Sequence, residues 1–282
     1  MVEGSTAKGS QWLRRQFRSI SVRETLRFSR SKAVSGAELY EGEDIETFAT
    51  DWHFHEGWQL VALTKGERRY QLRNGSVIAK PGQLIVLPPR LVHKARCTAR
   101  GKTSFKIATI PEIWVDVGAA SAAISQSTPK LVDAFVSVFK MLTFADDAET
   151  KAMILPRLQE ILAESISASG SGSSTLPPLV LQIESYMLER LDQVPSLDFL
   201  SSLAGLSRYH FAHTFSKHVG LSPLAFHSRA RLMQARLLIA QGWSLSDTSA
   251  YLKFSDQSHF GRHFKRVYGM TPGRYQQSVA AR

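Results

Sequence analysis

LSDTSAYLKFSDQSHFGRHFKRVYGMTPGRYQ, residues 245–276, decides the fold of the second half of this chain, and SLDFLSSLAGLSRYHFAHTFSKHVGLSPL, residues 196–224, repeats its pattern. In each stretch a short apolar helix is expected to meet a tight turn, at 204–206 and 252–254, followed by a helix rich in His, Arg, Lys and small polar residues. A second helix of this kind fits the major groove of DNA. Two such units joined by one helix predict two contacts with one face of a duplex, about one helical turn apart.

Composition sets the broad class of protein. With 282 residues, 43% of them apolar, the chain can form two globular domains with separate cores. The one cysteine, Cys97, excludes an internal disulfide and favours a reducing compartment. No apolar run approaches membrane-spanning length, and the arginine-rich first residues lack the apolar stretch of a signal peptide. We therefore expect a cytoplasmic protein without a membrane partner.

Positive charge is concentrated in two places. Residues 178–282 carry 12 Lys or Arg against 6 Asp or Glu, which fits the binding of DNA phosphates. Residues 65–106 carry 11 Lys or Arg against 1 Asp or Glu, which is a larger excess of positive charge in a shorter segment. Like charges at this density repel one another unless an anion neutralises them, and the arginine fork suits phosphates and carboxylates. An anionic ligand is therefore one interpretation of the second block; a solvated surface or a face that contacts the DNA backbone is the other.

The chain divides into five segments by pattern. Short apolar runs separated by Gly, Pro and Asn-Gly signals predict an antiparallel barrel or sandwich, and the runs that follow have apolar residues at helical spacing. The predicted fold class is α+β with two domains, an antiparallel β-barrel with flanking helices and an all-α tandem helix-turn-helix. The expected segments are an N-terminal arm 1–35, a barrel 36–120, helices 121–166 that cover the core or pair in a homodimer, a flexible linker 167–178, and the helix-turn-helix domain 179–282.

Residues 178–282 resemble the DNA-binding domain of the AraC/XylS family of bacterial transcription regulators. The stretch GRHFKRVYGMTPGRYQ, residues 261–276, carries the resemblance together with FSDQSHF, residues 254–260, and residues 203–224 match it less strictly. The resemblance implies a DNA-binding regulator and not an enzyme. Its implied partners are double-stranded DNA and RNA polymerase.

Two recognition helices are predicted, near 207–217 and 255–266. Phenylalanines at 211, 215, 260 and 264 recur at i and i+4, so they should lie on the buried face of each helix. Lys217, Lys265 and Arg266 are placed for phosphates, which position the protein on DNA without specifying sequence. The full set of candidate DNA-binding residues, the others resembling the family's base readers or flanking them, is Arg208, Tyr209, Ala212, His213, Lys217, Gln257, Ser258, His259, Arg262, Lys265 and Arg266.

Three positions depart from the family pattern. His213 stands where arginine is frequent, and Ala212 offers only apolar contact, so the first unit is expected to read DNA weakly or to prefer a thymine methyl. Lys253 occupies a turn position where glycine is common, which predicts turn strain. Two helical hairpins that contact protein are the alternative, which the cationic outward faces disfavour.

The N-terminal half resembles the cupin-like barrel that regulators of this family use to sense small molecules. The resemblance rests on His53-Phe54-His55 and on PGQLIVLPPRLVH, residues 81–93. In metal-binding cupins two histidines on one strand face, a carboxylate and a distant third histidine hold the ion, which makes His53, His55 and His93 candidates. Gln59 stands at the carboxylate position and is a poor ligand. We therefore predict no metal, no cofactor and no catalytic residue; a metal-dependent barrel enzyme fused to a DNA-binding domain is the alternative.

Within the basic block, Arg69 and Arg73 form an Arg-x-x-x-Arg sequence that resembles the cyclic di-GMP motif of PilZ domains. We therefore predict a phosphorylated anion such as cyclic di-GMP as the effector, with a carboxylate, amino acid or sugar as the alternative. If 68–73 form one strand, Arg69 and Arg73 point to one face and Arg68 and Tyr70 to the other. The candidate ligand residues, with aromatics that could stack on a purine, are Lys65, Arg68, Arg69, Arg73, Trp58, Tyr70 and Arg90.

Overall fold

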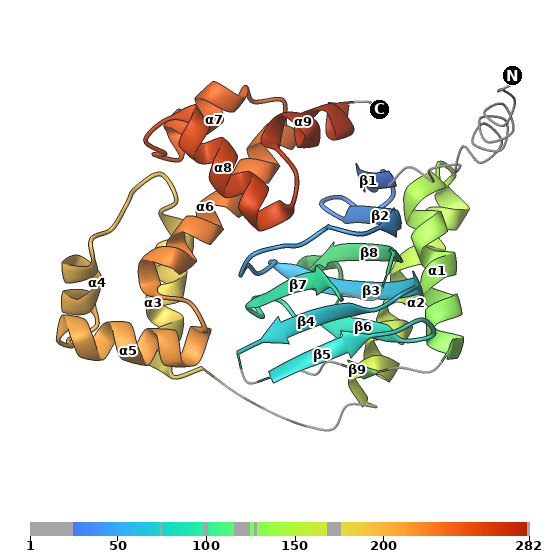
Figure 1. The fold of residues 1–282 in the computed structure, drawn as a ribbon, viewed down its shortest axis with the longest axis horizontal. Coiled ribbons are helices and arrows are strands. Elements are labelled where there is room, and N and C mark those ends of the chain that lie inside the picture. Colours follow the sequence, from blue (N-terminus) through green and yellow to red (C-terminus); the bar gives the residue numbers. More distant parts are fainter. Residues whose placement is uncertain are drawn as a thin grey trace, which may run out of the picture.

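The computed structural model describes residues 25–73, 75–98, 101–115, 125–126, 129–167 and 176–280. The first part of the chain forms two antiparallel sheets with two helices, and the second part is a helical domain (Figure 1). The predicted two-domain α+β class is therefore confirmed. Residues 1–24 of the expected N-terminal arm and residues 168–175 of the expected linker lie outside the described residues.

The larger sheet has the order β1-β2-β8-β3-β6-β9, with every described pair antiparallel. Because β1 pairs with β2 from its first residue, the sheet begins inside the segment that the sequence suggested was an arm. The strands are β1 Thr25–Arg30, β2 Glu38–Ile45, β3 Gly57–Lys65, β6 Leu84–Leu87, β8 Thr103–Pro111 and β9 Ser125–Gln126.

Two helices, α1 Pro129–Phe144 and α2 Ala148–Ser167, cover the outer face of this sheet (Figure 1). The central strand β3 shows why: Trp58 and Leu60 pack with the helices, whereas Val61 and Leu63 pack between the sheets. A strand that is buried on both faces has a continuous run of apolar residues, and alternate side chains of this run point to opposite faces of the sheet. Of the two roles expected for the helices, covering the core is the one that these contacts support.

The smaller sheet has the order β5-β4-β7, with bounds Gly75–Ala79, Arg68–Leu72 and His93–Cys97. The predicted hairpin between the apolar runs is the antiparallel pair β4–β5, in which Leu72 lies opposite Gly75. Side chains of this sheet and of the larger one line a shared cavity between the two sheets, described below. We call the two sheets with α1 and α2 the β domain.

Five helices of the helical domain have a capping side chain at the N-terminus. Side chains of Ser196, Ser207, Ser222, Ser244 and Asp256 each accept a hydrogen bond from the backbone N–H three residues later, which satisfies a donor that the helix itself cannot pair. The helices are α3 Pro178–Glu189, α4 Leu197–Leu203, α5 Arg208–Val219, α6 Pro223–Ala240, α7 Leu245–Tyr251, α8 Gln257–Tyr268 and α9 Pro272–Ala280.

The two domains share buried apolar surface. Tyr40 and Phe48 of the β domain belong to the same cluster as Phe264 and Tyr268 of α8. At a second contact the ring of Phe54 stacks on that of Phe226 at the start of α6, with centroids 4.7 Å apart. Among the described residues no helix is long and apolar enough to cross a membrane.

Candidate DNA-reading and effector sites

The recognition helices α5 and α8 bury the faces that the sequence predicted. Phe211 and Phe215 are 2% and 1% exposed, and Phe260 and Phe264 are fully buried. Each helix follows a short helix and a tight turn, α4 before α5 and α7 before α8. Both begin one or two residues later than predicted, and both end two residues later.

Their opposite faces carry the candidate DNA-binding residues. Tyr209 is 83% exposed, and its ring stacks on that of His213 with centroids 6.2 Å apart. Ala212 and His259 are half-buried, and the His259 Nδ1 lies 3.0 Å from the Ser255 hydroxyl. The exposed candidates are Arg208, Tyr209, His213, Lys217, Gln257, Ser258, Arg262, Lys265 and Arg266.

Two local features bear on how these helices are presented. The Arg208 guanidinium lies 3.0 Å from the carboxylate of Asp198 on α4, so this side chain is already engaged within the first unit. Lys253 has a φ of 54°, in the left-handed region that favours glycine. The predicted strain at this turn is therefore present.

Between the two sheets lies a small cavity that contains three histidines. The rings of His53 and His93 have centroids 4.4 Å apart, and that of His55 lies 4.9 and 5.5 Å from them. The cavity leaves about 30 Å³ of open space, enough for one or two water molecules. Its lining is Tyr40, Phe48, Thr50, His53, His55, Gln59, Arg68, Tyr70, His93, Ala95, Ile107 and Tyr268, the last of them from α8.

Burial determines the charge of these histidines. It lowers the pKa of His53 and His55 well below the usual range and that of His93 to about 4. All three are therefore neutral at pH 7. Arg68, 1% exposed, is held over the rings of Phe48 and Phe105 at 4.8 and 4.9 Å and donates to the Phe48 carbonyl.

A second hollow, which we call the basic cleft, lies where the smaller sheet meets the end of α8. Its volume is about 330 Å³. Four cations line it, and its one acidic residue, Asp51, is paired with Arg229 at 3.1 Å. The lining is Ala49, Thr50, Asp51, Arg69, Gln71, Lys94, Ala95, Arg96 and Arg266.

The predicted ligand residues are not brought together, which corrects the sequence interpretation. Alternation along β4 separates three of them as predicted for a single strand: Arg69 lines the basic cleft, while Arg68 and Tyr70 line the histidine cavity on the other face. The remaining candidates are scattered: Trp58 packs against the helices, Lys65 pairs with Asp44 at 2.6 Å, Arg73 lies beside Gly220 after α5, and Arg90 occupies a left-handed turn with φ 62°.

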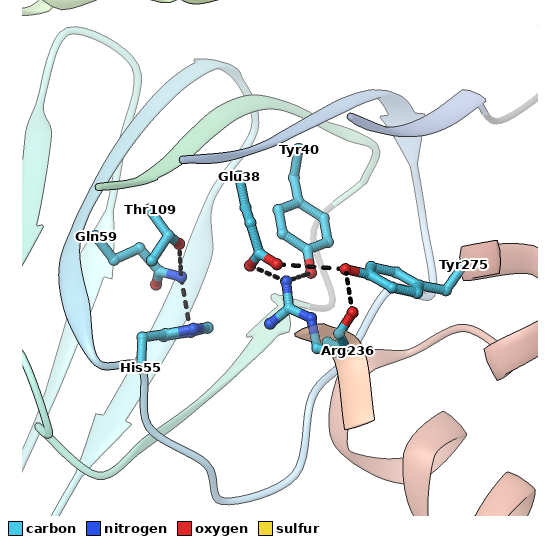
Figure 2. A network of polar contacts seen from close by, with 7 residues as sticks. All are labelled: Glu38, Tyr40, His55, Gln59, Thr109, Arg236 and Tyr275. Carbon is cyan, nitrogen blue, oxygen red and sulfur yellow. Dashed lines mark hydrogen bonds and ion pairs between the residues drawn. The ribbon is translucent and has the colours of Figure 1, made fainter. Parts of the chain in front are cut away.

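Sequence reasoning missed the polar network between the domains (Figure 2). Arg236 of α6 is 3% exposed and donates to the carboxylate of Glu38 and, at 2.7 Å, to the hydroxyl of Tyr40. The Tyr275 hydroxyl of α9 donates to the Arg236 carbonyl at 3.3 Å and lies 3.4 Å from the Glu38 carboxylate. The available signal was that Arg236 lies at i+4 from Leu232 and i−3 from Ile239, both buried in α6.

Beside this network lies a third hollow, which we call the α6 cleft, of about 440 Å³. One wall is apolar and includes Ile113, 88% exposed, and Met233 of α6. Glu38 and Arg236 stand at its polar end, where burial raises the pKa of Glu56. Its lining is Ser35, Gly36, Glu38, His55, Glu56, Gly57, Thr109, Pro111, Ile113, Trp114, Met233, Arg236 and Leu237.

Comparison with known proteins matches both domains. Residues 36–174 match the AraC-like ligand binding domain, and residues 200–278 match a helix-turn-helix domain family. A probable transcriptional regulator, LumQ, from Photobacterium leiognathi is 27% identical over 231 residues, 80% of this chain and 91% of that protein. The transcriptional regulator YbfI of Bacillus subtilis is 26% identical over 219 residues, 73% of this chain and 80% of that protein. The crystal structure of ToxT from Vibrio cholerae O395 has the same fold, with a TM-score of 0.64 at 10% identity, over 87% of this chain and 98% of that one.

A ligand-binding β domain followed by two helix-turn-helix units defines a ligand-responsive transcriptional regulator. The chain is a regulator of the AraC type, and its relatives are transcriptional regulators, not enzymes. The predicted resemblance to the AraC/XylS family is thereby confirmed.

Proposed function

We propose that α5 and α8 read double-stranded DNA, and that an anionic effector in the basic cleft changes how they are presented to it. The proposal of DNA reading rests on the exposed polar faces of the two helices, whose apolar faces are buried in the core. Lys265 and Arg266 at the end of α8 are placed for phosphates, and Gln257 and Arg262 for base edges.

The convergence of four cations across the domain boundary carries the effector proposal. Arg69 and Arg96 come from the smaller sheet and Arg266 from α8, with Lys94 beside them. A phosphate or carboxylate group bound there neutralises this cluster. Because Arg266 is also a candidate DNA phosphate contact, the same anion would change the charge that α8 offers to DNA.

Cyclic di-GMP is the phosphorylated compound to test first. Arg69 supports it through its place in the cleft, whereas Arg73 lies outside the cleft lining. Calorimetric titration of the full chain with cyclic di-GMP, GTP and a simple dicarboxylate should find one compound that binds. Arg69→Ala should weaken that binding about tenfold or more, the loss of one charge-assisted contact.

Arg73→Ala is the matched control, because it removes an exposed arginine from the end of the same strand. It should leave the affinity unchanged. Equal affinity in the wild type and Arg69→Ala, or no binding of any phosphorylated or carboxylate compound, would contradict the proposed effector site. The DNA-reading proposal would stand.

An amphipathic carboxylate in the α6 cleft is the second candidate effector. Its support is the combination of an apolar wall with the Arg236 guanidinium at one end. A ligand carboxylate could replace Glu38 as the partner of Arg236. Structures of ToxT contain an unsaturated fatty acid and (E)-4-(8-methylnaphthalen-1-yl)but-3-enoic acid, both apolar carboxylic acids. An unsaturated fatty acid belongs in the same titration, and Ile113→Glu should abolish its binding without affecting that of a phosphorylated anion. Equal fatty-acid binding in the wild type and Ile113→Glu would rule out this cleft.

We further propose a homodimer, formed through α1 and α2. Phe144 and Met153 are 79% and 45% exposed on these two helices. Phe144→Asp should shift the full chain toward the monomer in sedimentation velocity, and a monomeric wild type would rule the dimer out. RNA polymerase, the partner through which a DNA-bound regulator acts on transcription, is proposed on the family likeness alone.

A further inference from the structure

The three histidines of the cavity point toward one another. One nitrogen from each of His53, His55 and His93 lies within 4.8 Å of the other two, and all three residues are buried. His53 and His93 are held opposite each other by paired backbone hydrogen bonds of 2.9 Å in both directions. The backbone therefore fixes the convergence, and a shared ion requires the rings to rotate until each nitrogen lies about 2.0–2.1 Å from it.

Two of the rings are oriented by hydrogen bonds on the side away from the cluster. The Nδ1 of His53 lies 2.8 Å from the Asp51 carbonyl, and that of His93 lies 2.8 Å from the Leu91 carbonyl. A carbonyl only accepts, so each Nδ1 carries the proton and each Nε2 keeps its lone pair. This is the tautomer that a metal-binding histidine needs, and a backbone carbonyl is one of its usual supports.

His55 presents its lone pair in another way. The Gln59 amide nitrogen lies 2.8 Å from the His55 Nε2 and 3.5 Å from the Thr109 hydroxyl (Figure 2). An amide N–H that donates to Nε2 requires this nitrogen to be unprotonated. All three rings therefore offer a lone pair, and an ion that binds the His55 Nε2 would displace its hydrogen bond with Gln59.

The size and charge of the cavity limit what can bind among these rings. About 30 Å³ of open space suits an ion with one water or one small ligand, and it excludes a nucleotide. Among the described lining residues none is acidic and Arg68 is cationic. An ion would therefore favour an anionic further ligand, such as hydroxide.

We propose that His53, His55 and His93 bind one divalent transition-metal ion of the class that prefers imidazole, Zn²⁺, Co²⁺ or Ni²⁺. This reverses the expectation of no metal, which rested on Gln59. The proposal does not depend on an effector in either cleft, although His55 also lines the α6 cleft. Tyr268 of α8 lines the same cavity, and its ring centroid lies 6.4 Å from that of His53. Metal binding would therefore act on the contact between the β domain and the recognition helix.

The test uses the untagged full chain, freed of metal with a chelator and dialysed against Zn²⁺ or Co²⁺. Elemental analysis should find one ion per chain, and Co²⁺ should develop the visible absorption of a low-symmetry site. His93→Gln should weaken binding about 100-fold or more, since loss of a supporting partner alone costs 10–100-fold. His210→Gln is the control: it removes an exposed histidine from α5 and should change neither stoichiometry nor affinity.

Gln59→Glu keeps the proposal testable even if His93→Gln fails to fold. It adds a carboxylate beside His55, so it should tighten Zn²⁺ binding about tenfold or more, a gain that a purely structural cluster would not produce. A wild type that takes up less than one ion per chain would overturn the proposal. So would His93→Gln binding as tightly as the wild type, or Gln59→Glu without a gain in affinity.

Discussion

At the scale of the residue, Arg236 and Glu38 bring one charge from each domain into the same buried site. Replacing such a pair by apolar residues is frequently neutral, but removing one partner leaves an uncompensated buried charge. Here Tyr40 and Tyr275 add hydrogen bonds to the pair. The network therefore contributes orientation between the domains more than net stability.

Arg236→Met should reduce the free energy of unfolding by about 3–5 kcal/mol, because it leaves the Glu38 carboxylate unpaired. The double variant Arg236→Met with Glu38→Met should recover most of this loss. Urea denaturation followed by circular dichroism measures both. Arg274→Ala is the control, since the Arg274 side chain is exposed and loses only a hydrogen bond to the Leu26 carbonyl. If the double variant were no more stable than Arg236→Met, the pair would not be the source of the effect.

Glu184 on α3 predicts a dependence of stability on pH. It is 3% exposed, and burial raises its pKa to about 7, with Arg90 acting in the opposite direction. The folded protein thus holds the proton more tightly than the unfolded chain. The stabilisation is complete below the ordinary pKa of 4.5 and is lost as pH rises toward 7.

Glu184→Gln should therefore be more stable than the wild type at pH 8, by about 1–3 kcal/mol, and equal to it at pH 4.5. Thermal unfolding across this range gives the comparison. Glu189→Gln, at the exposed end of the same helix, should follow the wild type at every pH. Parallel profiles for Glu184→Gln and the wild type would show that this carboxyl does not titrate abnormally.

At the scale of the element, Gly269 ends α8 against the β domain. Its φ is 72°, and its N–H donates to the Lys265 carbonyl at 2.8 Å, so it caps the helix in the left-handed conformation. A Cβ added there would lie 2.4 Å from the Phe48 ring. The same atom therefore strains both the cap and the domain contact.

Gly269→Ala should destabilise the protein by about 2–4 kcal/mol, from the left-handed conformation together with overpacking of the ring. Gly205→Ala separates the cost of the left-handed conformation from the cost of overpacking. Gly205 also has a positive φ, 63°, but open space where the Cβ would stand, so the cost should be about 1 kcal/mol. Equal losses in the two variants, measured by chemical denaturation, would mean that Phe48 yields to the new side chain.

The elements that the sequence predicted are those whose signals are local. Phenylalanines at i and i+4 mark α5 and α8 without reference to the rest of the molecule. The Arg-x-x-x-Arg sequence does not mark one hollow, because Arg69 lines the basic cleft whereas Arg73, just past the end of β4, lies beside Gly220. Arg236 had no local signal of its partner, which lies 198 positions away.

At the scale of the whole molecule, α6 links the ligand-binding and DNA-reading parts. It joins the two helix-turn-helix units, and both Arg229 and Arg236 tie it to the β domain, the former through Asp51. The basic cleft and the α6 cleft lie at this boundary. A ligand that binds one arrangement of the domains better than another shifts the population of DNA-competent molecules by its difference in affinity.

The most direct test of the central claim is selection of bound duplexes from a random-sequence pool with the full chain, repeated with Gln257→Ala in α8. The account predicts an enriched motif with two contact sites about 10–10.5 base pairs apart, centre to centre. Gln257→Ala should relax the base preference in one site only, and the binding free energy that distinguishes the preferred base should fall by about 1–3 kcal/mol. A pool without enrichment, or one whose motif is unchanged in Gln257→Ala, would contradict DNA reading by these helices.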